Sequence, residues 1–185
     1  PDPKGEPDPM KLRFLAGAAA AALALPAAAQ AHVTLQPSTP QTPGAYTVLT
    51  MRVPNERDNA STTKIRLEVP EGIYAVSYKP VPGWRITVRR TPMATPVQTE
   101  DGPITHRVSS ILFRGSGKGL GRIRPGQFQE FALSLRLPET PGATLVFPAI
   151  QTYSNGEVVR WTGPAGSALP AATVKLSDAV APAHH

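Results

Sequence analysis

The chain has 185 residues, enough for one domain with a sizeable core. Its formal net charge is +6, but the Lys and Arg residues are scattered and lack aromatic interleaving, which argues against a nucleic-acid-binding protein. Cysteine is absent, so the fold has no disulfides and the chain offers no thiolate to a metal. Of the three methionines, Met10 lies in the N-terminal segment that export would remove, and Met51 and Met93 are too far apart in sequence to favour a Met-rich Cu(I) site.

Residues 10–31 have the pattern of a secretory signal peptide. Lys11 and Arg13 precede an apolar run over residues 14–25, and the small-residue segment Ala29-Gln30-Ala31 predicts cleavage before His32. The apolar run is shorter than the roughly 20 residues that a membrane-spanning helix needs. We therefore expect a periplasmic or secreted protein with no membrane anchor in its mature chain, and we interpret residues 1–9 as an upstream extension outside it.

Residues 32–177 are predicted to form one all-β domain, followed by a disordered tail over residues 178–185. Prolines punctuate short runs rich in β-branched and aromatic residues, and apolar residues alternate with charged ones in two runs, 63–69 and 131–137. The other expected strands are 46–53, 73–79, 84–90, 104–113, 144–151, 156–161 and 172–176. About seven to nine antiparallel strands favour an immunoglobulin- or fibronectin-III-like β-sandwich, with a cupredoxin-like barrel as the alternative.

Two loops stand out between these strands. Residues 116–126 are glycine-rich but lack the order of a phosphate-binding loop and its following helix, which indicates a surface loop. Asn155-Gly156 lies between two apolar runs and predicts a β-hairpin.

His32 is the leading candidate for chemistry. As a mature first residue, it would offer its free α-amine and its ring Nδ1 to the same metal ion. Cu(II) favours nitrogen and oxygen donors, so this pair of nitrogens suggests a copper site that still needs an oxygen. The alternative is that cleavage merely happens to expose a histidine.

Glu56 and Trp161 are the candidates that would complete such a site. Glu56 directly follows a predicted strand, on a loop that could return to the N-terminal edge, although a solvated glutamate paired with Arg57 is the simpler interpretation. Trp161 ends its strand at a Gly-Pro turn, which suits a ring that shields a metal at the rim of the sandwich, whereas most tryptophans of such folds, including Trp84, are core residues.

Four features in order resemble the YcnI-like family of secreted copper-binding proteins: the N-terminal His-Val-Thr, Val-Pro-Asn-Glu at 53–56, Pro-Gly-Trp at 82–84 and Trp-Thr-Gly-Pro at 161–164. The resemblance implies one Cu(II) in a monohistidine brace, with His32 giving amine and ring nitrogen, Glu56 a carboxylate, and Trp161 lying against the metal. It further implies a non-enzymatic role in copper acquisition or trafficking, beside a CopC/CopD-type importer or a PCuAC-type chaperone.

Two other functions stay open at this point. A copper-dependent oxygenase of the lytic polysaccharide monooxygenase type would need a second histidine, for which His106 is the candidate. A metal-independent adhesion or assembly module would need no ligand at all. His184 and His185 end the chain, where a solvated tail or an adventitious second metal site is expected.

Overall fold

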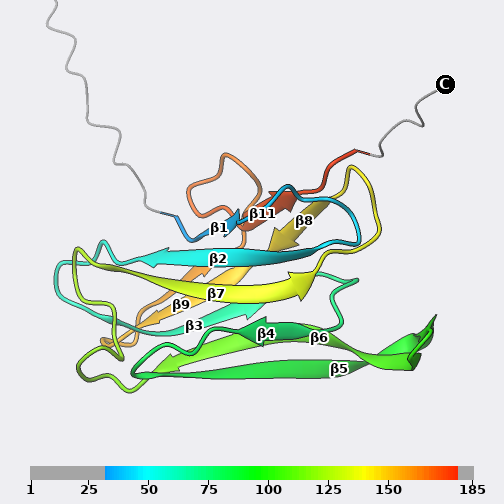
Figure 1. The fold of residues 1–185 in the computed structure, drawn as a ribbon. Helices are drawn as coiled ribbons and strands as arrows, with labels where there is room; N and C mark the ends of the chain where they lie inside the picture. The colour runs from blue at the N-terminus through cyan, green and yellow to red at the C-terminus, as the bar shows by residue number, and fades with distance from the viewer. Residues whose placement is uncertain (1–31, 179–185) are drawn as a thin grey trace, which may run out of the picture.

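The computed structural model describes residues 32–178, which contain eleven strands and no helix (Figure 1). No segment in this range is both helical and long and apolar enough to cross a membrane. The strands are β1 (Thr34–Pro37), β2 (Tyr46–Pro54), β3 (Thr62–Glu68), β4 (Val76–Tyr78), β5 (Trp84–Thr99), β6 (Gly102–Gly115), β7 (Phe128–Arg136), β8 (Thr144–Phe147), β9 (Ala149–Tyr153), β10 (Val158–Trp161) and β11 (Ala172–Lys175).

The strands form a sandwich of two antiparallel sheets. One sheet has the order β1-β2-β7-β4 and the other β10-β9-β3-β6-β5, while β8 and β11 pair with each other and lie beside β1 (Figure 1). The hairpin of β5 and β6 is the longest feature, and its tip projects beyond the body of the sandwich (Figure 1). The predicted all-β, immunoglobulin-like class is confirmed.

The core lies between the two sheets, where the inward residues of each strand meet. Phe131 of β7 packs against Phe113 of β6, with ring centroids 4.5 Å apart, and against Trp84 of β5 in a T-shaped contact at 5.0 Å. Such aromatic pairs add about 0.5–1.5 kcal/mol to the burial of their surface. Trp84 also donates from Nε1 to the carbonyl of Leu120, so the glycine-rich loop is held against the core by its own backbone.

The strands differ from the sequence prediction in several places, and β5 extends nine residues beyond the predicted end at residue 90. The run 144–151 divides at Pro148 into β8 and β9, which belong to different sheets, because proline has no N–H with which to continue a ladder. The short strand β1 was not predicted, and residues 73–79 contribute only Val76–Tyr78. With these differences the count rises to eleven, above the seven to nine expected.

The predicted hairpin at Asn155-Gly156 is present. Tyr153 and Glu157 close a three-residue loop, in which Gly156 has a positive φ of 89° and its N–H bonds to the carbonyl of Tyr153. The predicted signal peptide, the upstream extension and most of the predicted tail, including His184 and His185, lie outside the described residues.

Candidate metal centre

His32 lies at the start of β1, beside the end of β2. The antiparallel register pairs Thr34 with Arg52, and its continuation places His32 across from Pro54. The ring is half-buried and packs against Trp161, with centroids 5.6 Å apart and planes tilted by 58°. Its Nε2 is buried without a hydrogen-bond partner. The predicted chelate uses the other ring nitrogen, Nδ1, which is nearer the backbone of the same residue.

Trp161 is held in place by a polar residue that the sequence analysis did not single out. Its Nε1–H donates to Oε1 of Gln151 at 2.9 Å, and the Nε2 of Gln151 donates to the carbonyl of Pro54 at 2.9 Å and to Oγ1 of Thr62 at 2.7 Å. Gln151 has no exposed surface. It therefore ties the end of β2, opposite His32, to the indole that His32 contacts.

Glu56 lies two residues beyond Pro54, on the loop that follows β2, and its side chain is exposed. Its neighbour Asn55 is 2% exposed and anchors this loop, because its Nδ2 donates to the carbonyls of Ala60 (2.8 Å) and Ile123 (2.9 Å). The Oδ1 of Asn55 accepts from the N–H of Arg57 at 2.9 Å, which closes an Asx turn around Glu56. The loop is thus fixed while Glu56 itself points outward.

Arg57, the neighbour of Glu56, pairs with Glu157. Its Nη2 lies 2.6 Å and its Nε 3.1 Å from the carboxylate, and its guanidinium stacks over the ring of Tyr153. The hydrogen bond from Arg57 holds the pKa of Glu157 below its usual value, and burial raises the pKa of Tyr153. This ion pair links the Glu56 loop to the hairpin of β9 and β10.

His32 also lines a cavity of about 430 Å³ between β1, β11 and the loop over residues 165–170. Within residues 32–178 no group of three His, Asp or Glu side chains is placed to hold a metal. The predicted brace needs no such group, because two of its three donors come from His32 alone. What the structure brings into direct contact is the ring of His32 and the ring of Trp161.

His106 does not join His32. It is exposed on β6, opposite Pro92 in the projecting part of the hairpin, where its Nδ1 lies 2.9 Å from Oγ1 of Thr105. Strands β3 and β9 separate β6 from β10, the strand that carries Trp161. The two-histidine arrangement that an oxygenase would need is therefore absent from the described part of the chain.

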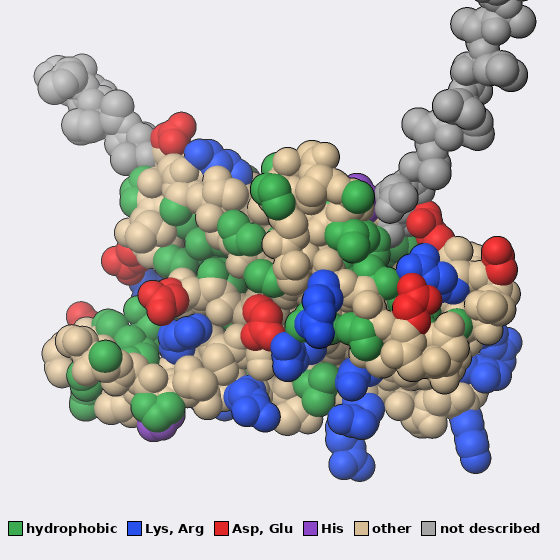
Figure 2. All heavy atoms as spheres, turned by 180° about the vertical axis from the view of Figure 1, so that it is seen from behind, with side chains coloured by type: hydrophobic (Ala, Val, Ile, Leu, Met, Phe, Trp, Pro, Cys, Tyr) green, Lys and Arg blue, Asp and Glu red, His purple; other side chains and the backbone are tan. Residues whose placement is uncertain are grey.

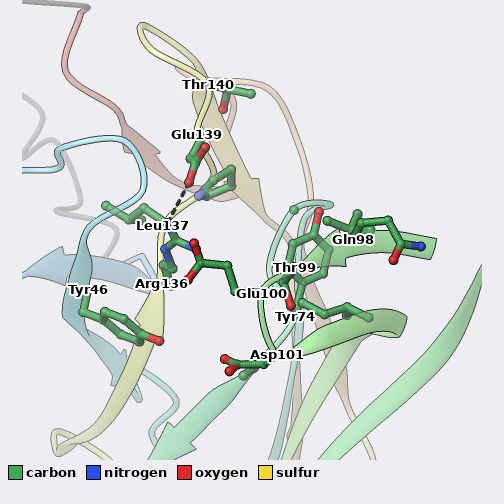
Figure 3. Close-up of a pocket in the computed structure, with 15 residues that line it drawn as sticks. Tyr46, Tyr74, Gln98, Thr99, Glu100, Asp101, Arg136, Leu137, Glu139 and Thr140 are labelled. Carbon is green, nitrogen blue, oxygen red and sulfur yellow. Dashed lines mark hydrogen bonds and ion pairs between the residues drawn. The ribbon is translucent and has the colours of Figure 1, made fainter. Parts of the chain in front are cut away.

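A larger cavity of about 820 Å³ lies at the opposite end of β2, between the tip of the β5–β6 hairpin and the end of β7. Figure 3 shows Tyr46 and Tyr74 on different sides of it, near the ion pair of Arg136 and Glu139 (2.6 Å). Strand β2 spans nine residues, so roughly 25 Å separates this cavity from the His32 end. It contains none of the predicted ligands.

Comparison with known proteins places the chain in a family. Residues 32–180 match the model for a domain of unknown function, DUF1775. The copper-binding protein CutI of Bacillus subtilis (strain 168) is 28% identical over 153 residues, which is 83% of this chain and 66% of CutI, so the chain spans slightly less than two thirds of that relative. An uncharacterized protein from Nocardia farcinica with an immunoglobulin-like fold is 31% identical, with a TM-score of 0.62 over 79% of this chain and 98% of its own.

Both relatives agree with the prediction of a non-enzymatic protein, since one is named for copper binding and the other for its immunoglobulin-like fold. The family match begins at His32, the residue predicted to follow the signal peptide, and it covers all the described residues. The chain belongs to the DUF1775 family, and its predicted resemblance to the YcnI-like proteins is confirmed.

Proposed function

We propose that this protein is exported and binds one Cu(II) ion through His32 after cleavage between Ala31 and His32. The observation that carries the proposal is the position of His32, whose ring packs against Trp161 with its Nε2 buried, so that Nδ1 is the ring nitrogen left for an ion that the α-amine also binds. The name of the relative CutI supports copper as that ion.

The proposed donors suit copper in its divalent state, Cu(II). His32 contributes the α-amine and Nδ1, and Glu56 contributes a carboxylate oxygen, which gives the nitrogen and oxygen donors that Cu(II) prefers. Trp161 covers one side of the ion and limits its open positions. A free α-amine has a pKa of about 7.7–8.0, so Cu(II) must displace a proton from it near neutral pH. Cu(II) binding should therefore weaken as the pH falls below neutrality.

The same donor set suggests how the ion is released. Neither thiolate nor paired thioethers lie in the described part of the site, so reduction to Cu(I) should loosen binding. A site that holds Cu(II) and yields Cu(I) fits copper acquisition or trafficking in the periplasm or outside the cell. A CopC/CopD-type importer or a PCuAC-type chaperone would be the recipient or donor.

The test compares two proteins that differ by one residue, one beginning at His32 and one with a glycine before it. The extra residue removes the free amine beside the ring but leaves every side chain in place. We expect Cu(II) affinity, measured by competition, to fall by at least the roughly 10- to 100-fold that loss of an outer-shell partner costs at a metal site. Unchanged affinity would show that His32 is a bystander.

Side-chain variants of the protein beginning at His32 then assign the oxygen. Glu56→Gln should weaken Cu(II) binding and change the Cu(II) electron paramagnetic resonance spectrum. Asp58→Asn, two residues along the same loop, and His106→Ala are the matched controls and should leave both unchanged. Loss of binding in His106→Ala would instead support the oxygenase arrangement.

A further inference from the structure

Most of the net charge of the described residues lies on one face of the protein. Residues 32–178 contain 16 Lys and Arg and 10 Asp and Glu residues. Six of the cations alternate with inward residues on four strands of the five-stranded sheet, and they point away from the core. We call these six side chains the basic face: Lys64, Arg66, Arg85, Arg89, Arg114 and Arg160. The same outward positions carry one acid, Glu68, so the face has a net charge of +5.

The register places these cations in rows across the strands. Arg114 of β6 lies directly opposite Lys64 of β3 and directly opposite Arg85 of β5, so three cations stand side by side. In the next row, Arg66 and Arg160 flank Ile150 of β9. Like charges in directly opposed positions destabilise a sheet, so this arrangement costs folding free energy.

Most of the basic face is unpaired within the described part of the chain. Arg66 bonds to Glu68 through its Nε, 2.7 Å from Oε1. The other five cations make no ion pair or side-chain hydrogen bond with any described residue. Figure 2 views the molecule from behind and shows Lys and Arg side chains across its middle and lower part, several of them extending away from the body.

The chemistry of the face favours an anionic membrane surface over an acidic protein. Protein interfaces are built around aromatic anchors and exclude charge from their centre. The outward positions in these rows hold no Phe, Tyr or Trp, and the cations are spread over the whole sheet rather than around a pocket. A broad distribution of cations suits a plane of anionic headgroups, to which each Lys or Arg contributes about fivefold in partition.

We infer that the basic face binds this protein peripherally to membranes rich in anionic phospholipid. The orientation leaves the proposed copper site accessible. Arg160 and Trp161 are consecutive in β10, so their side chains point to opposite sides of the sheet. A membrane against the basic face would therefore lie on the far side of β10 from His32, and copper binding and membrane binding should be independent.

The experiment is co-sedimentation of the protein beginning at His32 with vesicles of phosphatidylglycerol and phosphatidylcholine, against vesicles of phosphatidylcholine alone. Binding is expected only with phosphatidylglycerol, and it should weaken as salt is added. Arg85→Gln with Arg114→Gln should reduce partition roughly 20- to 30-fold. The control pair, Lys79→Gln with Lys175→Gln, removes the same charge from β11 and from the residue after β4, and should retain binding.

Thermal unfolding of both double variants checks that they fold. The inference is overturned if wild-type protein does not bind phosphatidylglycerol vesicles, if it binds both lipids equally, or if the two double variants lose binding equally. Binding to soluble poly-glutamate but not to vesicles would assign the face to an acidic polypeptide instead. Cu(II) affinity should be the same in both double variants, so failure here is distinguishable from failure of the proposed function.

Discussion

Gln151 provides the most demanding test of how the candidate site is built. The variant Gln151→Met keeps the side chain close to its original length but removes all its hydrogen bonds. Three buried groups then lose a partner, namely the carbonyl of Pro54, Oγ1 of Thr62 and the indole N–H of Trp161. Each unsatisfied buried group costs about 1–3 kcal/mol.

These three costs are not independent, so we expect a total loss of about 3–5 kcal/mol in the free energy of unfolding. That is a large part of the roughly 5–15 kcal/mol that stabilises a typical domain. The measurement is urea unfolding followed by circular dichroism. Gln98→Met, at an exposed position on β5, is the control and should change stability by less than about 0.5 kcal/mol.

A double-mutant cycle isolates the bond that matters for the site. Trp161→Phe removes the N–H that Gln151 accepts but keeps an aromatic ring against His32. In combination with Gln151→Met, the two changes should show a coupling of about 1 kcal/mol. A loss below about 1 kcal/mol for Gln151→Met alone, or additive effects in the cycle, would refute the role assigned to Gln151.

Two further predictions concern charge. The hydrogen bond from Arg57 lowers the pKa of Glu157 from 4.5, so the pair stabilises the protein above that pH, and its contribution is lost as the pH falls through the lowered pKa. Glu157→Gln should therefore flatten the acid limb of a plot of stability against pH. An unchanged acid limb would contradict this. Arg114→Thr should raise stability by about 0.5 kcal/mol at low ionic strength, by relieving repulsion from Lys64 and Arg85. The free energy of unfolding, measured in urea, should show this gain shrink as salt is added, because salt screens the repulsion. A lower stability of the variant would contradict the idea that these cations repel one another.

The strands with strict alternation were the predictable part of the fold. Residues 63–69 and 131–137 coincide closely with β3 and β7, because each has one buried and one solvated face. The break at Pro148 was not predicted, since the apolar run continues through it and only the missing N–H marks the change of sheet. Strand β1 has four residues and too little pattern to be recognised.

The residues that position the site were harder to predict than the candidate ligands. His32 was predicted as a ligand from its position alone, because a cleavage motif precedes it. Nothing comparable marks Gln151, one of whose partners is 97 residues away in sequence, and Asn55 entered only as a member of the Val-Pro-Asn-Glu segment. One signal was available for Gln151: the alternation that places Ala149 and Tyr153 inward also places Gln151 inward, and a buried glutamine requires partners.

The proposed metal site depends on the way strand ends meet. Antiparallel pairing sets the start of β1 beside the end of β2, so His32 and the loop of Glu56 belong to the same end of the sandwich. No short sequence motif around either residue predicts this arrangement. Trp161 comes from the other sheet, and Gln151 joins it to the carbonyl of Pro54 across the core. The ring that His32 contacts is therefore fixed before any ion arrives, which reduces the ordering that binding must bring about.

Because Gln151 fixes this ring, Gln151→Met should weaken Cu(II) binding roughly 10- to 100-fold in protein that is still folded, although Gln151 would touch neither the ion nor His32. Undiminished affinity in that variant would mean that the proposed site owes nothing to the position of Trp161.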